Sequence, residues 1–175
     1  MESRSLRRGL MVGLAGLALA SACTIDYAPP DARRGETVPS ADTTMVLTEL
    51  RSYYRDLSAR DWTAFSGHFW PGATIATRWQ PPGEDSVRVW ITSVPEFVAA
   101  TPTGPDSRPI FEESMVDARI RMMGDLAQAW VLYRARFGDP GAVEEWQGID
   151  AFTLLQHGGR WRIAALTFGR TANGP

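Results

Sequence analysis

Acid–base chemistry is the chemistry that this sequence is best equipped to perform, and two side chains stand out as its carriers. Asp150 lies just before the apolar run 152–155, where burial would shift a carboxyl pKa toward neutrality. His68 adjoins Phe69 and is one of two histidines, and an imidazole changes charge near neutral pH. Structural roles are also open to both: Asp150 as a strand-end carboxylate that is partly solvated or caps a backbone group, and His68 as a half-buried imidazole held by a backbone carbonyl.

Aromatic side chains form a second group of candidates, suited to binding rather than to reaction. A tyrosine hydroxyl can donate a hydrogen bond to a ligand oxygen, and a tryptophan ring can line an apolar pocket. The candidate ligand-binding residues are Tyr53, Tyr54, Trp70, Trp79, Tyr133 and Trp146. The alternative is that these rings fill the core, with Trp70 and Trp79 plugging any cavity.

Other chemistries find no support in the sequence. The two histidines stand apart, without cysteines or clustered acids at metal-ligand spacing, so we expect no metal site. We find no GxSxG nucleophile motif, phosphate-binding loop, dinucleotide-binding glycine pattern or HExxH motif, and we expect no cofactor. His157 adjoins a Gly-Gly turn and is expected to face solvent.

Composition narrows the class of protein further. The chain has 175 residues, 44% of them hydrophobic and 22% charged, which predicts one globular domain with a sufficient core. The formal net charge is −2, and all 18 basic residues are arginine. No polybasic segment is present, so we expect no nucleic-acid partner.

The N-terminus predicts export. Arg4, Arg7 and Arg8 precede an apolar run at 9–20, which is shorter than the roughly 20 residues needed to span a bilayer as a helix. Residues 1–22 are therefore predicted to be a signal peptide.

The end of this segment resembles a bacterial lipoprotein box. Leu19-Ala20-Ser21-Ala22-Cys23 places small residues before the only cysteine of the chain, which predicts lipidation of Cys23 and anchoring to the cell envelope as the sole membrane contact. Ala20-Ser21-Ala22 also fits ordinary signal peptidase, which would release the chain unanchored. Residues 23–41 are rich in proline and poor in apolar residues and are predicted to be a flexible tether, and 171–175 a disordered tail.

Residues 42–170 carry the patterns of a folded domain that begins with helices. Val46, Leu50, Tyr54 and Leu57 recur at helical spacing and predict a long amphipathic helix. A second helix is expected to open at Asp61 and to end at Pro71-Gly72. Residues 73–79 and 87–92 are strand-like, and Ser93-Val94-Pro95-Glu96 predicts a capping box on a third helix that stops before Pro102.

The second half predicts two antiparallel hairpins. Their strands are 110–123, 126–137, 145–157 and 160–170, with turns at Gly124-Asp125 and Gly158-Gly159. Two-residue turns fix the expected pairs of the first hairpin as Arg121 with Gln128, Arg119 with Trp130, Asp117 with Leu132, and Glu113 with Arg136. Its opposite face, expected to line the core or pocket, holds Ile120, Ala118, Val116, Ala129, Val131 and Tyr133.

In the second hairpin the same counting places Asp150 beside Thr167. Their expected face also carries Phe152, Leu154, Ile163 and Ala165, and the other face is apolar as well. A sheet that is apolar on both sides needs cover on both. Helices would cover one side, and we expect a second copy of the chain to cover the other, as a homodimer.

These features resemble the nuclear transport factor 2-like (SnoaL-like) superfamily. The resemblance rests on Phe111-Glu112-Glu113, on the turn at 124–127, on Gly148-Ile149-Asp150 running into 152–155, and on the closing hairpin 158–163. It implies an α+β cone-shaped fold in which N-terminal helices pack on a curved, mainly antiparallel sheet around an apolar pocket. Members include isomerases, dehydratases, polyketide cyclases and non-catalytic modules, so function depends on the site.

The resemblance also bears on catalysis. Ketosteroid isomerase-like members place a catalytic carboxylate on the first strand after the second helix, and the corresponding stretch 73–78 offers Thr77 and no acid. We therefore expect a non-catalytic domain that binds a small apolar or aromatic ligand, or a protein partner. The alternative is a cyclase, isomerase or dehydratase with Asp150 or His68 as base and a tyrosine as oxyanion donor, and a third is a purely structural domain.

Overall fold

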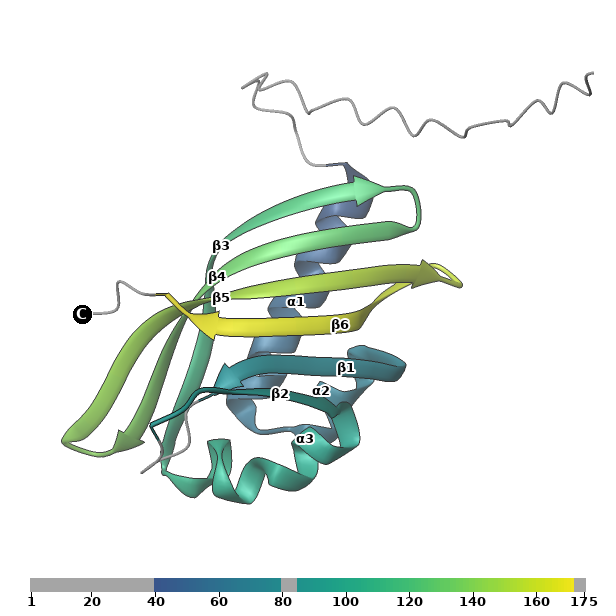
Figure 1. The fold of residues 1–175 in the computed structure, drawn as a ribbon. Coiled ribbons are helices and arrows are strands. Elements are labelled where there is room, and N and C mark those ends of the chain that lie inside the picture. The colour runs from purple at the N-terminus through teal and green to yellow at the C-terminus, as the bar shows by residue number, and fades with distance from the viewer. Residues whose placement is uncertain (1–39, 80–84, 172–175) are drawn as a thin grey trace, which may run out of the picture. The chain divides into compact units, whose positions relative to one another are not determined.

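The computed structural model describes residues 40–79 and 85–171, which form an α+β domain with helices packed on one face of a single sheet (Figure 1). The predicted signal peptide, Cys23, the tether up to residue 39, part of the loop after Trp79 and residues 172–175 lie outside this range. Within the part that the structure covers, no helix has the length and apolar character needed to cross a membrane.

Helix α1 (Ala41–Ala59) contains the predicted amphipathic segment and begins directly after Ser40. The hydroxyl of Ser40 accepts a hydrogen bond from the backbone amide of Thr43, and Arg60 ends the helix in the left-handed conformation at φ 57°. Its buried face consists of Val46, Leu50, Tyr53, Tyr54, Asp56 and Leu57. Two shorter helices follow, α2 (Trp62–Gly67), capped by Asp61, and α3 (Val94–Ala100), which opens with the predicted capping box.

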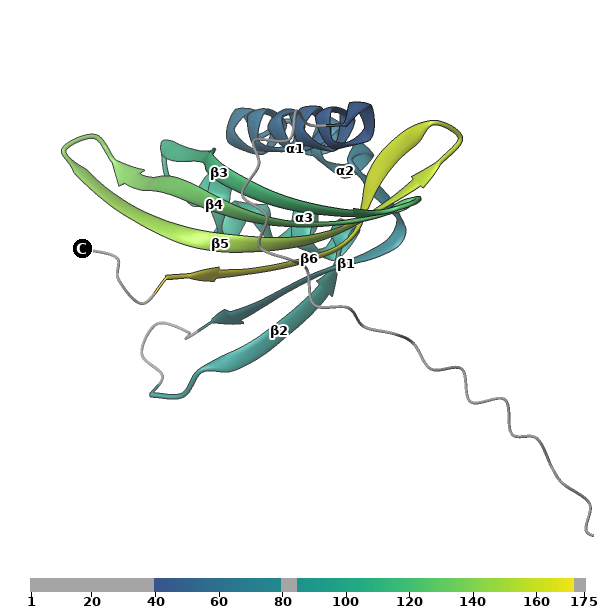
Figure 2. The same ribbon diagram turned by 90° about the horizontal axis from the view of Figure 1, so that it is seen from above.

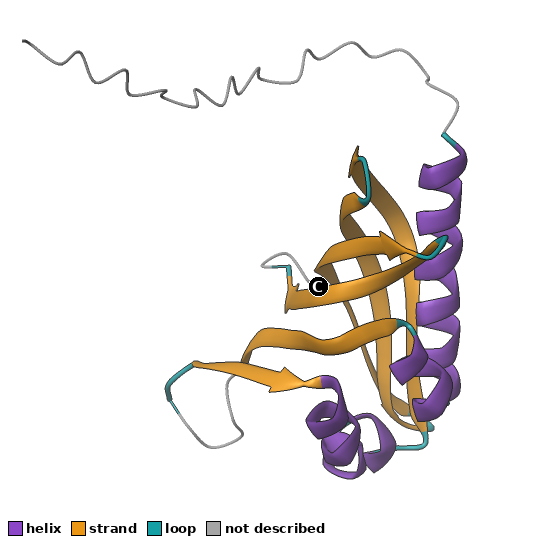
Figure 3. Ribbon diagram, turned by 90° about the vertical axis from the view of Figure 1, so that its right-hand side faces the viewer, coloured by secondary structure: helices purple, strands orange, loops and turns teal. Residues whose placement is uncertain are grey.

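The sheet has six strands in the order β2-β1-β6-β5-β4-β3, with β1 and β6 parallel and every other neighbouring pair antiparallel. The strands curve around α1, which lies along the concave face, while α2 and α3 lie near one end of it (Figures 2 and 3). The bounds are β1 (Phe69–Trp79), β2 (Arg88–Ser93), β3 (Ile110–Met123), β4 (Leu126–Asp139), β5 (Ala142–His157) and β6 (Arg160–Arg170).

The boundary between α2 and β1 differs from the prediction. The helix ends at Gly67, and Phe69 already belongs to β1, so Pro71 and Gly72 lie within the strand. The pairing of β1 with β6 is irregular between Phe69 and Thr74. A proline, which has no amide hydrogen, is tolerated where a strand ladder is interrupted in this way.

The first predicted hairpin is correct near its turn and wrong beyond a bulge. Arg121 pairs with Gln128, Arg119 with Trp130 and Asp117 with Leu132, as expected, but the register shifts between Met115 and Asp117. Val116 is the extra residue and is 49% exposed, so its predicted place on the inner face is wrong.

The same bulge overturns the predicted pair of Glu113 with Arg136. Glu113 lies opposite Ala135 on the inner face, and Arg136 lies opposite Glu112. Arg136 forms ion pairs with Glu112 at 2.8 Å and with Glu145 at 3.0 Å on the outer face. A shift of one residue turns a side chain to the other face of a strand, and here it sends a glutamate inward.

A second bulge changes the register of the last hairpin from the one predicted. Gly158 and Gly159 both have positive φ, as a two-residue turn requires, and Leu154 pairs with Ile163 as expected. The register then shifts between Thr153 and Leu154, so Asp150 pairs with Phe168 and not with Thr167. Thr167 is exposed, and Ala165, which pairs with Thr153, also leaves the predicted face.

Candidate functional site

The candidate site is a group of five ionisable side chains between α1 and the concave face of the sheet. We call it the carboxyl–tyrosine cluster. It consists of Tyr53, Tyr54, Glu113, Tyr133 and Asp150, which come from α1, β3, β4 and β5. The inward faces of three adjacent strands bring the last three together, and the helical face that covers the sheet supplies the two tyrosines.

Asp150 is the most buried acid of the cluster. It is 2% exposed, and the hydroxyl of Tyr54 donates a hydrogen bond to its carboxylate. Burial raises the pKa of Asp150 to about 7, and the hydrogen bond from Tyr54 opposes that rise. The structural role considered for Asp150, a partly solvated strand-end carboxylate, does not describe this environment.

Glu113 is the second acid, and the bulge in β3 is what brings it inside. Its backbone amide and carbonyl are both hydrogen-bonded to the hydroxyl of Ser58 on α1, at 2.8 and 2.7 Å. Its carboxyl makes no hydrogen bond or ion pair with another residue of the described segments. Burial, followed by the charge of Asp150, raises the pKa of Glu113 to about 8.

Tyr133 is the last member of the cluster, and its position explains why residue 148, which pairs with it, is a glycine. A Cβ added at Gly148 would lie 2.3 Å from the hydroxyl oxygen of Tyr133, so only glycine lets the tyrosine lie across β5 at this position. Burial, Glu113 and Asp150 all raise the pKa of Tyr133, while a hydrogen bond from Trp146 and the charge of Arg170 oppose them. The guanidinium of Arg170 lies 3.9 Å from the ring centre of Trp146.

A surface depression of about 420 Å³ leads to the cluster between α1 and the edge strand β3. Tyr54 and Glu113 belong both to its lining and to the cluster. The remaining lining residues are Arg51, Arg55, Ser58, Ser114 and Met115. A small molecule in this depression would therefore meet the inward carboxyl of Glu113, whereas Asp150 does not line the depression.

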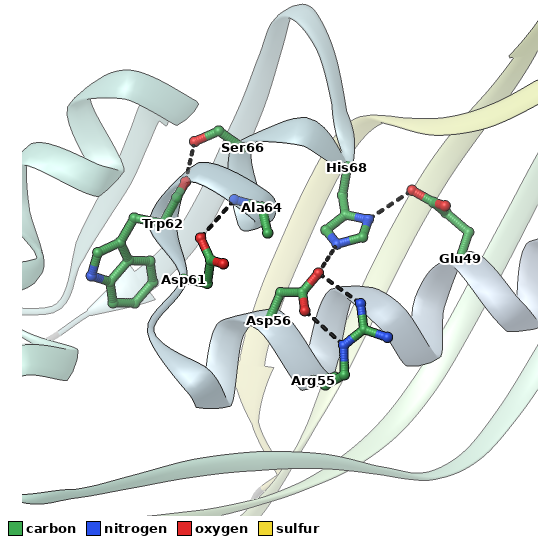
Figure 4. A network of polar contacts seen from close by, with 8 residues as sticks. All are labelled: Glu49, Arg55, Asp56, Asp61, Trp62, Ala64, Ser66 and His68. Atoms are coloured by element: carbon green, nitrogen blue, oxygen red, sulfur yellow. Dashed lines mark hydrogen bonds and ion pairs between the residues drawn. The ribbon is translucent and has the colours of Figure 1, made fainter.

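His68 lies in a second polar network, which it forms with residues of α1 (Figure 4). The ring centre of Tyr53 lies 6.3 Å from that of His68. Its Nδ1 is 2.8 Å from Glu49 and its Nε2 is 2.9 Å from Asp56, and Asp56 also accepts two hydrogen bonds from Arg55. Burial by itself would lower the pKa of His68, but the hydrogen bonds to Glu49 and Asp56 outweigh it and raise the pKa. Carboxylates hold this imidazole, not the backbone carbonyl considered from the sequence.

Solved structures identify the architecture. No family model matches the sequence, and no curated protein matches it. A nuclear transport factor 2-like protein from Shewanella baltica matches with a TM-score of 0.55 at 15% identity, over 78% of this chain and 99% of its own. The domain has the nuclear transport factor 2-like fold.

Two further structures show how widely this fold is used. A protein from Streptomyces avermitilis, provisionally described as a dehydratase of the nuclear transport factor 2-like family, matches with a TM-score of 0.59 at 12% identity, over 77% and 99% of the two chains. The CamKII hub homology domain from Chlamydamonas reinhardtii matches with a TM-score of 0.57 at 16% identity, over 75% and 99%. At such identities the likeness concerns the fold alone.

On this nuclear transport factor 2-like scaffold, the predicted site residues separate into two groups. Tyr53, Tyr54, Tyr133 and Asp150 come together in the cluster, with Trp146 beside Tyr133. His68 and Trp70 lie elsewhere. The indole of Trp70 donates to the carbonyl of Leu155 at 3.0 Å and lines a second depression, of about 510 Å³, with Met123, Asp125, Leu126, Leu155, Gln156 and His157. Trp79 ends β1, and its side chain lies outside the description.

Glu113 is the site residue that the sequence interpretation missed. Adjacent residues of a strand point to opposite faces, so the pair Glu112-Glu113 must send one carboxyl inward wherever one face of the strand is covered. That signal was available in the sequence, but the choice between the two glutamates depends on the bulge. Within residues 40–79 and 85–171, no group of three His, Cys, Asp or Glu side chains is placed to hold a metal ion.

Proposed function

We propose that this domain binds a small, largely apolar molecule, taken up through the depression between α1 and β3. The single observation that carries the proposal is that Tyr54 and Glu113 line this depression while also belonging to the carboxyl–tyrosine cluster. Apolar and aromatic surface with a few converging polar groups is the usual make-up of a small-molecule site.

The polar groups set the orientation of such a ligand. Asp150 has one hydrogen bond, from Tyr54, and Glu113 has a carboxyl without a partner in the described segments. A structural core avoids uncompensated buried carboxyls because they cost stability. The presence of both carboxyls in one cluster supports a binding role over a purely structural one.

Two methionine substitutions test the site. Met115 lines the proposed depression and Met123 lines the second one, so Met115→Trp fills the first and Met123→Trp the second. Small aromatic fragments, screened by ligand-observed NMR on the full-length protein, are expected to lose binding in Met115→Trp and to keep it in Met123→Trp. The reverse pattern, or equal binding by both variants, would refute the proposed site.

A second candidate function is acid–base catalysis, favoured by the raised pKa values of about 7 for Asp150 and about 8 for Glu113. An ionised Asp150 could take a proton from carbon while a protonated Glu113 gives one to a departing hydroxyl, which leaves as water. The reaction would be the dehydration of a β-hydroxy carbonyl compound. In this scheme Asp150 takes the role of the catalytic carboxylate that residues 73–78 lack. His68 takes no part in this scheme, because it lies outside the cluster.

Measuring product formation distinguishes catalysis from binding alone. If the domain is a dehydratase, a panel of β-hydroxy ketones will yield the unsaturated product, and Asp150→Asn will lower kcat by at least about a hundredfold while Met123→Trp leaves it unchanged. Binding of the panel without any product, in protein shown to be folded, leaves the binding function as the better account.

We also propose a homodimer formed through the outer face of the sheet. Trp130 in β4 is 57% exposed, and Val89 and Ile91 in the edge strand β2 are 72% and 66% exposed. Exposed apolar side chains on a sheet face are typical of interaction surfaces. Sedimentation equilibrium is expected to give twice the monomer mass for the natural chain and a monomer for Trp130→Arg, and a monomeric natural chain would refute the proposal.

Export and anchoring remain proposals that rest on the N-terminal sequence. We propose cleavage before Cys23 and attachment of lipid to its sulfur, which would hold the domain at the cell envelope. Intact-mass measurement of protein from its own membranes is expected to show a lipidated chain beginning at Cys23. A chain that begins at another residue, or an unmodified Cys23, would refute the anchor.

A further inference from the structure

One end of the sheet carries both the turn at 124–125 and the turn at 158–159, and the second depression lies there. We call it the turn end. We propose that the turn end rests on the surface of a phospholipid bilayer, where Met123 and Leu155 insert among the lipids and Trp70 lies at the level of the headgroups. The inference rests on the lipid anchor proposed above, because the anchor is what brings the domain to a membrane.

Apolar side chains form a row across three strands at the turn end. Met123 pairs with Leu126, and Leu126 pairs with Leu155, so all three lie on the same face of β3, β4 and β5. Met123 is 71% exposed and Leu155 is 43% exposed, while their neighbours Ala127 and Leu154 are fully buried. Successive residues of a strand alternate between faces, so this apolar row points away from the core.

The depression, of about 510 Å³, is lined by the apolar row and by Trp70 from the start of β1, together with Asp125, Gln156 and His157. The two hairpins are joined here, since the backbone amide of Gln156 donates to the carbonyl of Asp125 at 2.8 Å. The indole of Trp70 donates to the carbonyl of Leu155, which holds the ring beside the row. An exposed apolar patch of this kind marks a surface that contacts a partner or a membrane.

Two arginines beside the row suit the phosphate groups of lipids. Arg162 pairs with Leu155, and its guanidinium lies 5.1 Å from the ring centre of Trp70. Arg160 follows the second turn and is exposed. Tryptophan is enriched at the level of lipid headgroups, and arginine binds phosphate through paired hydrogen bonds. Tryptophan, arginine and exposed apolar side chains therefore meet at the turn end in the combination that a phospholipid surface requires.

The start of α1 lies at the turn end as well (Figures 1 and 2). Ser58, near the end of the helix, is hydrogen-bonded to the backbone of Glu113 near the start of β3, so the start of the helix lies toward the other end of that strand. The predicted tether from Cys23 joins the domain here and can span at most about 60 Å when fully extended. An anchored domain therefore meets the bilayer at a high effective concentration, with this end nearest to it.

The size of the patch favours a bilayer over a second protein. A stable protein–protein interface takes roughly 20 to 30 residues from each partner. The apolar row and Trp70 supply four apolar side chains, which are too few for such an interface but add to the membrane affinity of an anchored chain. The proposed dimer surface around Trp130 is separate, because Trp130 lies about 13 Å along β4 from Leu126 at the rise of a strand.

Quenching by brominated lipids tests this orientation. The natural chain, extracted from its own membranes, is placed in phosphatidylcholine–phosphatidylglycerol vesicles whose acyl chains carry bromine, which quenches the fluorescence of tryptophans that touch the bilayer. The vesicles should quench part of the fluorescence, and Trp70→Phe should reduce the quenched amount at least about twofold. Trp130→Phe is the matched control, since Trp130 is 57% exposed in the middle of β4, and it should leave the quenched amount unchanged.

Two glutamate substitutions on β3 test the insertion itself. Met123→Glu should reduce the quenching at least about twofold, because a carboxylate is costly to place among lipids. Val116→Glu, on the same strand and 49% exposed, should not reduce it. Equal losses in both variants would show a general effect of charge and would overturn the inference.

Flotation with the vesicles separates this inference from the anchor on which it rests. A chain that floats but shows the same quenching in Trp70→Phe as in the natural protein would overturn the inference and leave the anchor standing. Self-association in detergent that Met123→Glu abolishes would place a second copy at the turn end and would also overturn it. If the chain carries no lipid and does not float, the anchor itself is wrong, and the inference falls with it.

Discussion

The hydroxyl of Tyr54 on α1 donates a hydrogen bond to the carboxylate of Asp150 on β5, across a separation of 96 residues. Both residues are buried, so this bond joins the helix to the centre of the sheet inside the domain. It also favours the ionised form of Asp150 against the effect of burial. One contact therefore contributes both to the packing of α1 and to the charge of the candidate site.

The first prediction concerns this bond. Tyr54→Phe removes the donor, so the pKa of Asp150 should rise further and the folded state should lose about 1 to 3 kcal/mol at a pH where the carboxylate is ionised. Near pH 5, where Asp150 is protonated, the loss should be smaller. Urea unfolding at the two pH values measures both effects.

Tyr53→Phe is the control for that measurement. Its ring packs against Tyr54, Phe65 and Phe152, but its hydroxyl makes no hydrogen bond within the described segments. It should therefore show little difference between the two pH values. A pH dependence as large as that of Tyr54→Phe would argue against a specific role for the Tyr54 hydroxyl.

The second prediction follows from the two raised carboxyl pKa values. Asp150 and Glu113 titrate at about 7 and about 8 in the folded state, above their values in an unfolded chain, so the folded state holds the extra protons. Stability should therefore fall as pH rises from about 4 toward 8. Asp150→Asn and Glu113→Gln should each flatten this fall and should stabilise the protein near pH 8 by at least about 1 kcal/mol.

Denaturant titrations across that pH range test the point. Glu112→Gln serves as the control, since its exposed carboxylate is paired with Arg136. An unchanged pH profile in both Asp150→Asn and Glu113→Gln would mean that the two acids are ionised as freely inside the domain as in the unfolded chain.

The third prediction concerns His68, whose two ring nitrogens each face a carboxylate. Both nitrogens can donate to carboxylates only in the protonated imidazolium. The pKa of His68 is raised, so the stability it provides is fully present below about pH 6.5 and is lost as pH rises through the higher folded value. His68→Gln should cost more near pH 5.5 than near pH 9, by roughly 1 kcal/mol.

His157 offers a matched control for this network. It is exposed, so His157→Gln should be nearly neutral at both pH values. Direct NMR titration of the His68 imidazole gives a second measurement, in which its pKa should lie above the ordinary histidine value of about 6.5. A lower pKa would show that His68 is not held as an imidazolium.

The helices and strands of the domain could be read from local signals. The apolar spacing from Val46 to Leu57 marked α1, and the capping box at Ser93 marked α3. The Gly158-Gly159 turn marked the last hairpin. Each of these signals depends on a few neighbouring residues, which is why the sequence alone was sufficient.

The site was harder to predict, because its geometry depends on two bulges. The extra residue Val116 turns Glu113 inward, and the shift between Thr153 and Leu154 sets Phe168 opposite Asp150. A bulge changes the register of everything beyond it, and neither bulge carries a distinctive residue such as glycine. The network of His68 with Glu49 and Asp56 likewise depends on how α1 packs against the start of β1, which no local pattern fixes.

The fourth prediction concerns the glycine that accommodates Tyr133. A Cβ at residue 148 would lie 2.3 Å from the Tyr133 hydroxyl and 2.4 Å from the backbone carbonyl of Gly169 in the neighbouring strand. The tyrosine could rotate away, but the backbone of β6 cannot move without breaking its pairing with β5. Gly148→Ala should therefore lower the free energy of unfolding by at least about 2 kcal/mol and should displace Tyr133 from the cluster.

Gly67→Ala is the control, because there is open space around its Cβ at the end of α2, and it should not change the free energy of unfolding. Thermal unfolding of both variants gives the comparison. Equal melting temperatures for the two variants would mean that β5 and β6 adjust freely at this point, and Tyr133 would then have no fixed place beside Glu113 and Asp150.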